Sequence, residues 1–103
     1  MSDANWPILE DELSLTIDEW SRRTGVGIDK SIRDKIAVGL RISLERNVQD
    51  ANTGQIRDAA IAFLDFSEPR LIEHMRGVSF SLDETRRDFC HKYPNFFPFC
   101  PYP

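Results

Sequence analysis

Cysteine and histidine side chains gather near the C-terminal end of this chain. Cys90 and His91 are neighbours, and Cys100 follows a short distance later. Thiolates and imidazole nitrogens are preferred ligands of zinc and copper ions in proteins. A structural zinc site usually takes four ligands at close spacing, and these residues supply too few at too wide a spacing. They are therefore weak metal candidates, and we expect neither a metal ion nor another cofactor.

The same two cysteines, Cys90 and Cys100, are also candidates for a disulfide. The bond would close a short loop, hold the end of the chain in place and stabilise the fold by about 3 kcal/mol, because it restricts the unfolded chain. The N-terminal residues show no secretory signal, and no apolar run is long enough to span a membrane. We therefore expect a cytoplasmic protein with no membrane partner. Because cytoplasmic thiols are kept reduced, free thiols are the expectation and the disulfide is the alternative.

Residues suited to catalysis are scarce. Glu84, Asp88 and His91 share one face of a predicted helix, but a di-iron bundle needs carboxylates from several helices and paired Glu-x-x-His motifs that are missing here. The turn at 25–31 lacks the glycine that precedes the lysine of a phosphate-binding loop. Neither Gly-x-Ser-x-Gly nor His-Glu-x-x-His occurs in the sequence. We therefore expect a protein without enzymatic activity.

The balance of charge narrows the choice of partner. The 103 residues carry a formal net charge of −4 at pH 7, and the Lys and Arg residues are scattered. General nucleic-acid binding needs clustered cations that neutralise phosphates, so we do not expect it. Arg22 and Arg23 each follow a carboxylate by one helical turn, and these carboxylates belong to Asp18 and Glu19. We expect both arginines to form i,i+4 ion pairs along one helix.

The last residues, 93–103, differ from the rest of the chain in composition. They combine aromatic residues, prolines and a cysteine, and they carry no charged side chain. Repeated prolines exclude a regular helix and remove donors that a central strand needs. This apolar segment must therefore be covered without secondary structure of its own, either by its own domain or by another protein. Its aromatic residues are the candidate partner-binding residues: Tyr93, Phe96, Phe97, Phe99 and Tyr102.

Helix signals dominate the sequence before this tail. Apolar residues recur at steps of three and four, and capping residues precede the repeats. We expect helices at about 6–24, 30–50, 55–66, 68–76 and 82–92, the second being the longest. Ser67 and Pro69 predict a helix break and restart. Ser81 and Glu84 predict a capping box at the start of the last helix.

The sequence predicts a single all-α domain. Residues 1–92 form a compact four- to five-helix bundle, and residues 93–103 form a non-helical tail of the same domain. Our leading hypothesis is a small non-catalytic protein that docks on another protein, as an accessory subunit, an inhibitor or an immunity-type protein does. A homodimer stays open as an alternative. Two further hypotheses are a thiol or metal module built on Cys90, His91 and Cys100, and a precursor whose tail is chemically modified.

Overall fold

The computed structural model describes residues 6–44 and 51–100, with side chains from residue 9 onward. Within these ranges the chain forms four helices: α1 (Trp6–Thr24), α2 (Lys30–Ser43), α3 (Thr53–Met75) and α4 (Leu82–Lys92). The same ranges contain no strand. The predicted all-α class and small helical bundle are thus confirmed, with four helices as the count in the described ranges.

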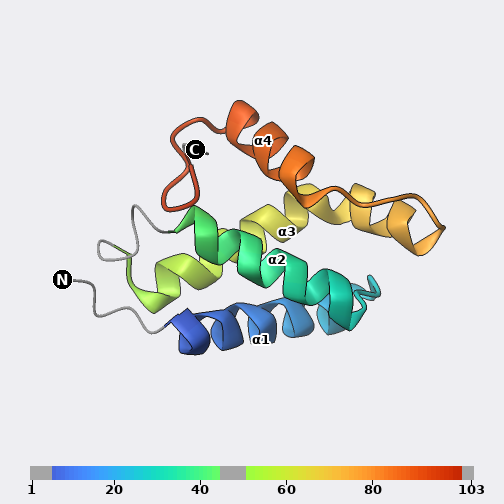
Figure 1. The fold of residues 1–103 in the computed structure, drawn as a ribbon, viewed down its shortest axis with the longest axis horizontal. Coiled ribbons are helices and arrows are strands. Elements are labelled where there is room, and N and C mark those ends of the chain that lie inside the picture. The colour runs from blue at the N-terminus through green and yellow to red at the C-terminus, as the bar shows by residue number, and fades with distance from the viewer. Residues whose placement is uncertain (1–5, 45–50, 101–103) are drawn as a thin grey trace.

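The helices pack around one shared core (Figure 1). α1 contacts both α2 and α3, and α4 contacts the same two helices from the other side. The tail turns back from the end of α4 toward the bundle. The largest fully buried side chains are Trp20, Phe63, Phe89, Leu13, Ile17, Ile36, Leu40, Leu44, Leu64, Leu71, Thr85 and Pro98.

The ends of α1 and α2 follow local sequence signals. Gly25 ends α1 with a φ of 77°, a left-handed conformation that favours glycine. Asp29 caps α2, and its side chain accepts from the Ile32 N–H over 2.9 Å. α2 ends at Ser43, earlier than predicted, and residues 45–50 lie outside the described ranges. α3 has 23 residues and α2 has 14, so the prediction that α2 is the longest helix is wrong.

α3 is one helix where the sequence predicts two. It runs for 23 residues and continues through Pro69. Its buried face explains the continuity, since Phe63, Ser67 and Leu71 follow one another at four-residue steps and are all buried. The Ser67 hydroxyl donates to the Phe63 carbonyl oxygen over 2.8 Å and so does not cap a new helix. A proline inside a helix removes one backbone hydrogen bond. The burial of side chains before and after Pro69 stabilises the continuous helix by more than this loss. The predicted restart at Ser67 is wrong.

α4 is placed by its N-cap and by a buried arginine. Ser81 caps the helix at the predicted position, and its hydroxyl accepts from the Glu84 N–H over 3.2 Å. Arg86 reaches α2, where its Nη1 donates to the Gly39 carbonyl oxygen over 2.6 Å. The two helices approach closely there, and only glycine fits at position 39, because a Cβ on that residue would collide with Leu82. These contacts fix the helix from which the tail begins.

Ion pairs join α1 to both of its neighbours. Arg33 of α2 donates from Nη1 to Asp18 Oδ2 over 3.1 Å. Arg57 of α3 donates from Nη2 to both carboxylate oxygens of Glu19 over 2.9 and 3.1 Å. Desolvation alone would lower the pKa of Arg33, but the carboxylates of Asp18 and Asp34 raise it above its ordinary value. The two pairs tie three helices together at the surface.

The i,i+4 pairs predicted within α1 are wrong as a consequence. Asp18 and Glu19 are engaged by arginines of other helices. Arg22 and Arg23 form no ion pair or hydrogen bond with any residue in the ranges 6–44 and 51–100. An i,i+4 pair on an exposed helix contributes only about 0.3–0.5 kcal/mol, so a cation on a packed neighbour readily replaces it. Two exposed cations are left near the end of α1.

Candidate functional site

A disulfide joins the tail to the last helix. Cys90, in the last turn of α4, bonds to Cys100, and their Cα atoms lie 5.5 Å apart. The structure therefore has the disulfide that the sequence offered as the alternative, in place of free thiols. The bond closes residues 90–100 into a ring, which we call the disulfide loop.

The bond also bears on the weak metal candidates Cys90, His91 and Cys100. A disulfide presents no thiolate, and thiolate is the form of cysteine that binds a metal ion. The His91 side chain is exposed. Among the described residues, no group of three or more His, Cys, Asp or Glu side chains is placed to hold a metal ion. The structure thus joins Cys90 and Cys100 in a disulfide that closes the loop, and does not arrange them as ligands of a metal ion.

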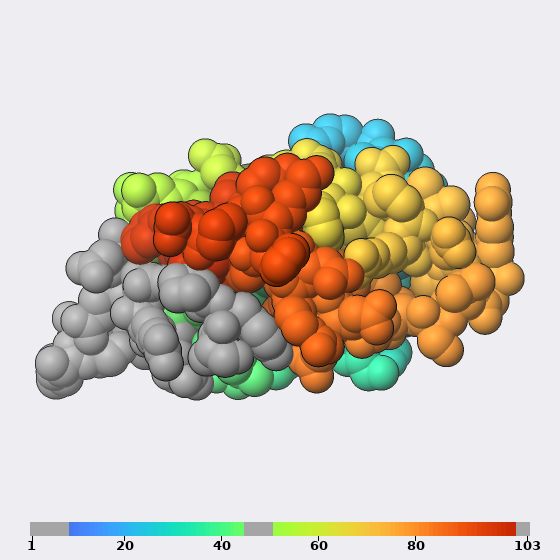
Figure 2. All heavy atoms as spheres, turned by 90° about the horizontal axis from the view of Figure 1, so that it is seen from above, coloured from blue at the N-terminus to red at the C-terminus, as the bar shows by residue number. Residues whose placement is uncertain are grey.

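Two of the predicted tail aromatics turn inward. Phe99 is 2% exposed and joins the core together with Pro98 and Cys100. Phe96 is half-buried, and its ring meets that of Phe89 edge-on with centroids 5.0 Å apart. The Cys100 N–H donates to the Phe96 carbonyl oxygen over 2.8 Å, which closes the turn between them. These contacts seat the loop on its own domain, and Figure 2 shows the tail (red) lying against α3 and α4.

Two other tail aromatics turn outward. Tyr93 is 41% exposed and Phe97 is 42% exposed. Phe97 is followed directly by the buried residues Pro98 and Phe99, so the core holds the neighbouring backbone while part of Phe97 stays in contact with solvent. Tyr102, the last predicted binding residue, lies outside the described ranges. The disulfide loop therefore presents apolar rings on a fixed backbone.

A hollow of about 650 Å³ opens beside the loop, and we call it the aromatic hollow. Phe66, Phe89, Tyr93 and Phe96 form its aromatic wall. The Phe89 ring lies 5.3 Å from the rings of both Phe66 and Tyr93, so it is the centre of the cluster. The Lys92 ammonium lies 5.4 Å from the Tyr93 ring centre and 6.0 Å from that of Phe66, within cation–π range. The hollow combines an apolar wall with a positive charge at its rim.

Phe66, Phe89 and Lys92 belong to this site, and the sequence does not single them out. One usable signal was present, because Phe89 and Tyr93 lie four residues apart and such residues meet on one face of a helix. Phe66 gives no such signal. Its contact with α4 depends on how α3 and α4 pack, which local spacing does not reveal.

Known proteins do not add to this description. In the described residues, no helix is both long and apolar enough to cross a membrane. No family model, no curated protein and no solved structure matches this chain.

Proposed function

We propose that this chain is a small non-catalytic protein that docks on another protein through the exposed rings of its disulfide loop. The position of Phe97 carries the proposal, since this residue is 42% exposed while the next residues, Pro98 and Phe99, are buried. Tyr93, which is 41% exposed although its ring packs against Phe89, adds a second partly exposed aromatic residue at the start of the tail. An accessory subunit, an inhibitor or an immunity-type protein acts by such docking alone.

A loop that is fixed before binding favours this role. Immobilising a rotamer-rich side chain at an interface costs about 0.5–1.5 kcal/mol of binding free energy. The total cost of ordering the loop on binding is smaller when its backbone is already held in place. The disulfide, the buried Phe99 and the ring contact between Phe96 and Phe89 hold it here. Aromatic anchors are frequent hot spots, because each ring buries about 150–250 Å². The partner is therefore a protein with an apolar pocket that accepts a phenyl ring.

The disulfide bears on where that partner is met. Structural disulfides persist in oxidising compartments and are rare in the cytoplasm. The cytoplasmic location expected from the sequence stays a prediction, and the Cys90–Cys100 bond weighs against it. A free-thiol count on protein taken from its native host decides the matter. Reduced cysteines would support the cytoplasm, and a complete lack of free thiol would support an oxidising compartment.

The other hypotheses receive less support from the geometry. A reactive thiol module needs an accessible sulfur, and Cys100 is 4% exposed. A precursor needs its tail within reach of a modifying enzyme, whereas Phe99 and Cys100 belong to the core. A homodimer would be the special case in which a second copy supplies the pocket, and sedimentation equilibrium of the purified protein detects it.

The test is affinity capture from an extract of the native host under non-reducing conditions. Three baits are compared: the wild type, Tyr93→Ala/Phe97→Ala, and Met75→Ala/Val78→Ala. The last pair is a matched control, because Met75 and Val78 are 56% and 51% exposed and lie outside the loop. We expect a stoichiometric partner on the wild type and the control that is lost from the loop variant. Equal capture by all three baits, or no partner on the wild type, would refute the proposal.

A further inference from the structure

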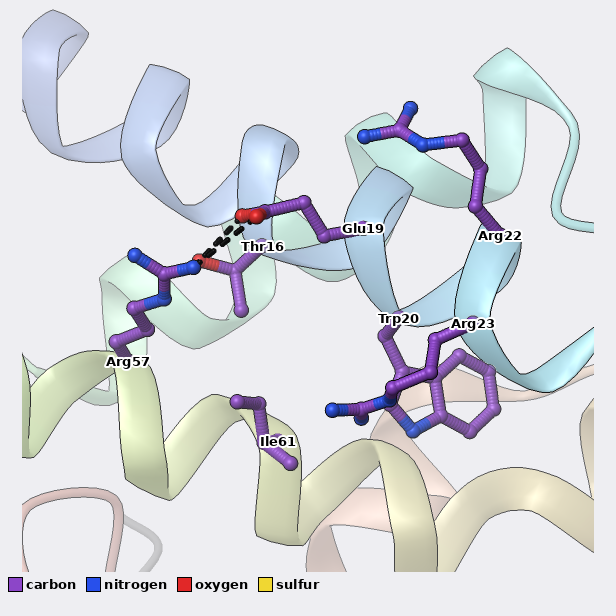
Figure 3. Close-up of a pocket in the computed structure, with 7 residues that line it drawn as sticks. All are labelled: Thr16, Glu19, Trp20, Arg22, Arg23, Arg57 and Ile61. Atoms are coloured by element: carbon purple, nitrogen blue, oxygen red, sulfur yellow. Dashed lines mark hydrogen bonds and ion pairs between the residues drawn. The ribbon is translucent and has the colours of Figure 1, made fainter.

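A second hollow, of about 460 Å³, lies between α1 and α3 (Figure 3). It shares no lining residue with the aromatic hollow. Three arginines are among its lining residues, Arg22 and Arg23 from α1 and Arg57 from α3, and we call it the arginine hollow. Its volume falls within the range of about 300–1,000 Å³ that small-molecule sites occupy.

The arginine hollow already holds one carboxylate, which belongs to the chain itself. Arg57 donates from Nη2 to Glu19 Oε1 and Oε2 over 2.9 and 3.1 Å, as the dashed lines in Figure 3 mark. Both side chains are about half exposed, at 49% and 50%. The pair shows that Arg57 holds a carboxylate here, and solvent reaches both side chains.

The other two arginines lie in the last turn of α1 and are exposed to solvent. Arg22 and Arg23 have no ion pair or hydrogen bond within residues 6–44 and 51–100, because Asp18 and Glu19 are engaged by Arg33 and Arg57. Among the lining residues, the three arginines outnumber the one carboxylate, Glu19, and a second carboxylate, Asp65, lies beside the lining, where it accepts from Trp20 Nε1 over 2.9 Å. The chain as a whole carries a net charge of −4, so this local positive charge attracts anions to the hollow and not to the protein surface in general.

The hollow also has an apolar part. Trp20, which is 1% exposed, and the half-buried Ile61 line it. Apolar lining lowers the local dielectric and strengthens charge-assisted hydrogen bonds to guanidinium groups. A ligand with a charged end and a small organic body would meet both kinds of surface.

We propose that the arginine hollow binds a small molecule that carries two negative charges on oxygen, such as a phosphate monoester or a dicarboxylate. Guanidinium groups suit both, because their planar donors match the oxygens of either group. Glu19 acts as an internal competitor for the same cations. This site is independent of the disulfide loop, and its test does not depend on the docking proposal.

Two probes, inorganic phosphate and succinate, are titrated into the folded protein at low ionic strength. Amide chemical shifts are followed by NMR, with sodium chloride as the control for ionic strength. The variants are Arg22→Gln/Arg23→Gln and Glu19→Gln. Arg76→Gln/Arg87→Gln is the matched control, since both arginines are exposed and neither lines the hollow: Arg76 follows the end of α3, and Arg87 lies in α4. Circular dichroism checks each fold, and the single variants at 22 and 23 replace the double variant should it not fold.

If the hollow binds such a ligand, the amide chemical shifts of its residues should change and reach saturation with at least one of the two probes. Arg22→Gln/Arg23→Gln should weaken binding by about tenfold or more through lost charge-assisted hydrogen bonds. Glu19→Gln should tighten it, and the control pair should leave it nearly unchanged. The probe that binds more tightly identifies the phosphoryl or the dicarboxylate class. Shifts that do not saturate, or equal weakening by both arginine pairs, would overturn the proposal, because net charge alone would then explain the effect.

Discussion

At the scale of single residues, Phe97 and Phe99 show how identical side chains in one loop acquire opposite roles. Phe99 is 2% exposed and belongs to the core, whereas Phe97 is 42% exposed. Composition predicts both as binding residues, because the tail is apolar and non-helical. Which ring faces the core depends on where the Cys90–Cys100 bond holds the backbone. The aromatic character of the site could be predicted from the sequence, and the direction of each ring could not.

Alanine substitutions at these two positions separate stability from binding. Phe99→Ala removes a buried ring, and we expect it to lower the free energy of unfolding by about 3–5 kcal/mol. Phe97→Ala removes an exposed ring, and we expect a loss below about 1 kcal/mol. Denaturant unfolding followed by circular dichroism measures both values. Equal losses would mean that Phe97 is a structural residue and not a free anchor.

At the scale of elements, the residues that begin a helix were predicted better than the ion pairs between helices. Ser81 caps α4 as predicted, because an N-cap depends on residues three positions apart, and Asp29 caps α2 by the same local geometry. The ion pair predicted for Arg22 fails, because Asp18 pairs with Arg33 of another helix. That choice depends on packing between segments distant in sequence, which no local pattern contains.

Pro69 gives a direct test of the continuity of α3. It lies inside the helix, where a proline lacks a donor and its ring crowds the preceding turn. We expect Pro69→Ala to raise the free energy of unfolding by about 1–3 kcal/mol, since alanine restores the donor. Thermal melts of the two proteins measure the change. A lower melting temperature in the variant would mean that the bundle requires the proline, as the predicted helix break implied.

At the scale of the whole molecule, the disulfide makes the tail part of the fold. We expect Cys90→Ser/Cys100→Ser to lower the free energy of unfolding by about 2–4 kcal/mol, because the bond restricts the unfolded chain. The helical signal of the folded state should persist, since the helix caps and most of the core lie outside the loop. Wild-type protein under reducing conditions is the control and should match the variant. If reduction leaves wild-type stability unchanged, the bond does not contribute as described.

Docking through the disulfide loop is tested most directly by the affinity of the captured partner for the wild type and for Phe97→Ala. Titration calorimetry under non-reducing conditions gives both dissociation constants, and thermal melts of the free proteins run alongside. We expect the Kd to rise by about tenfold or more, as loss of a hot-spot ring implies, while the melting temperature changes little. An unchanged Kd for Phe97→Ala would contradict docking through this loop.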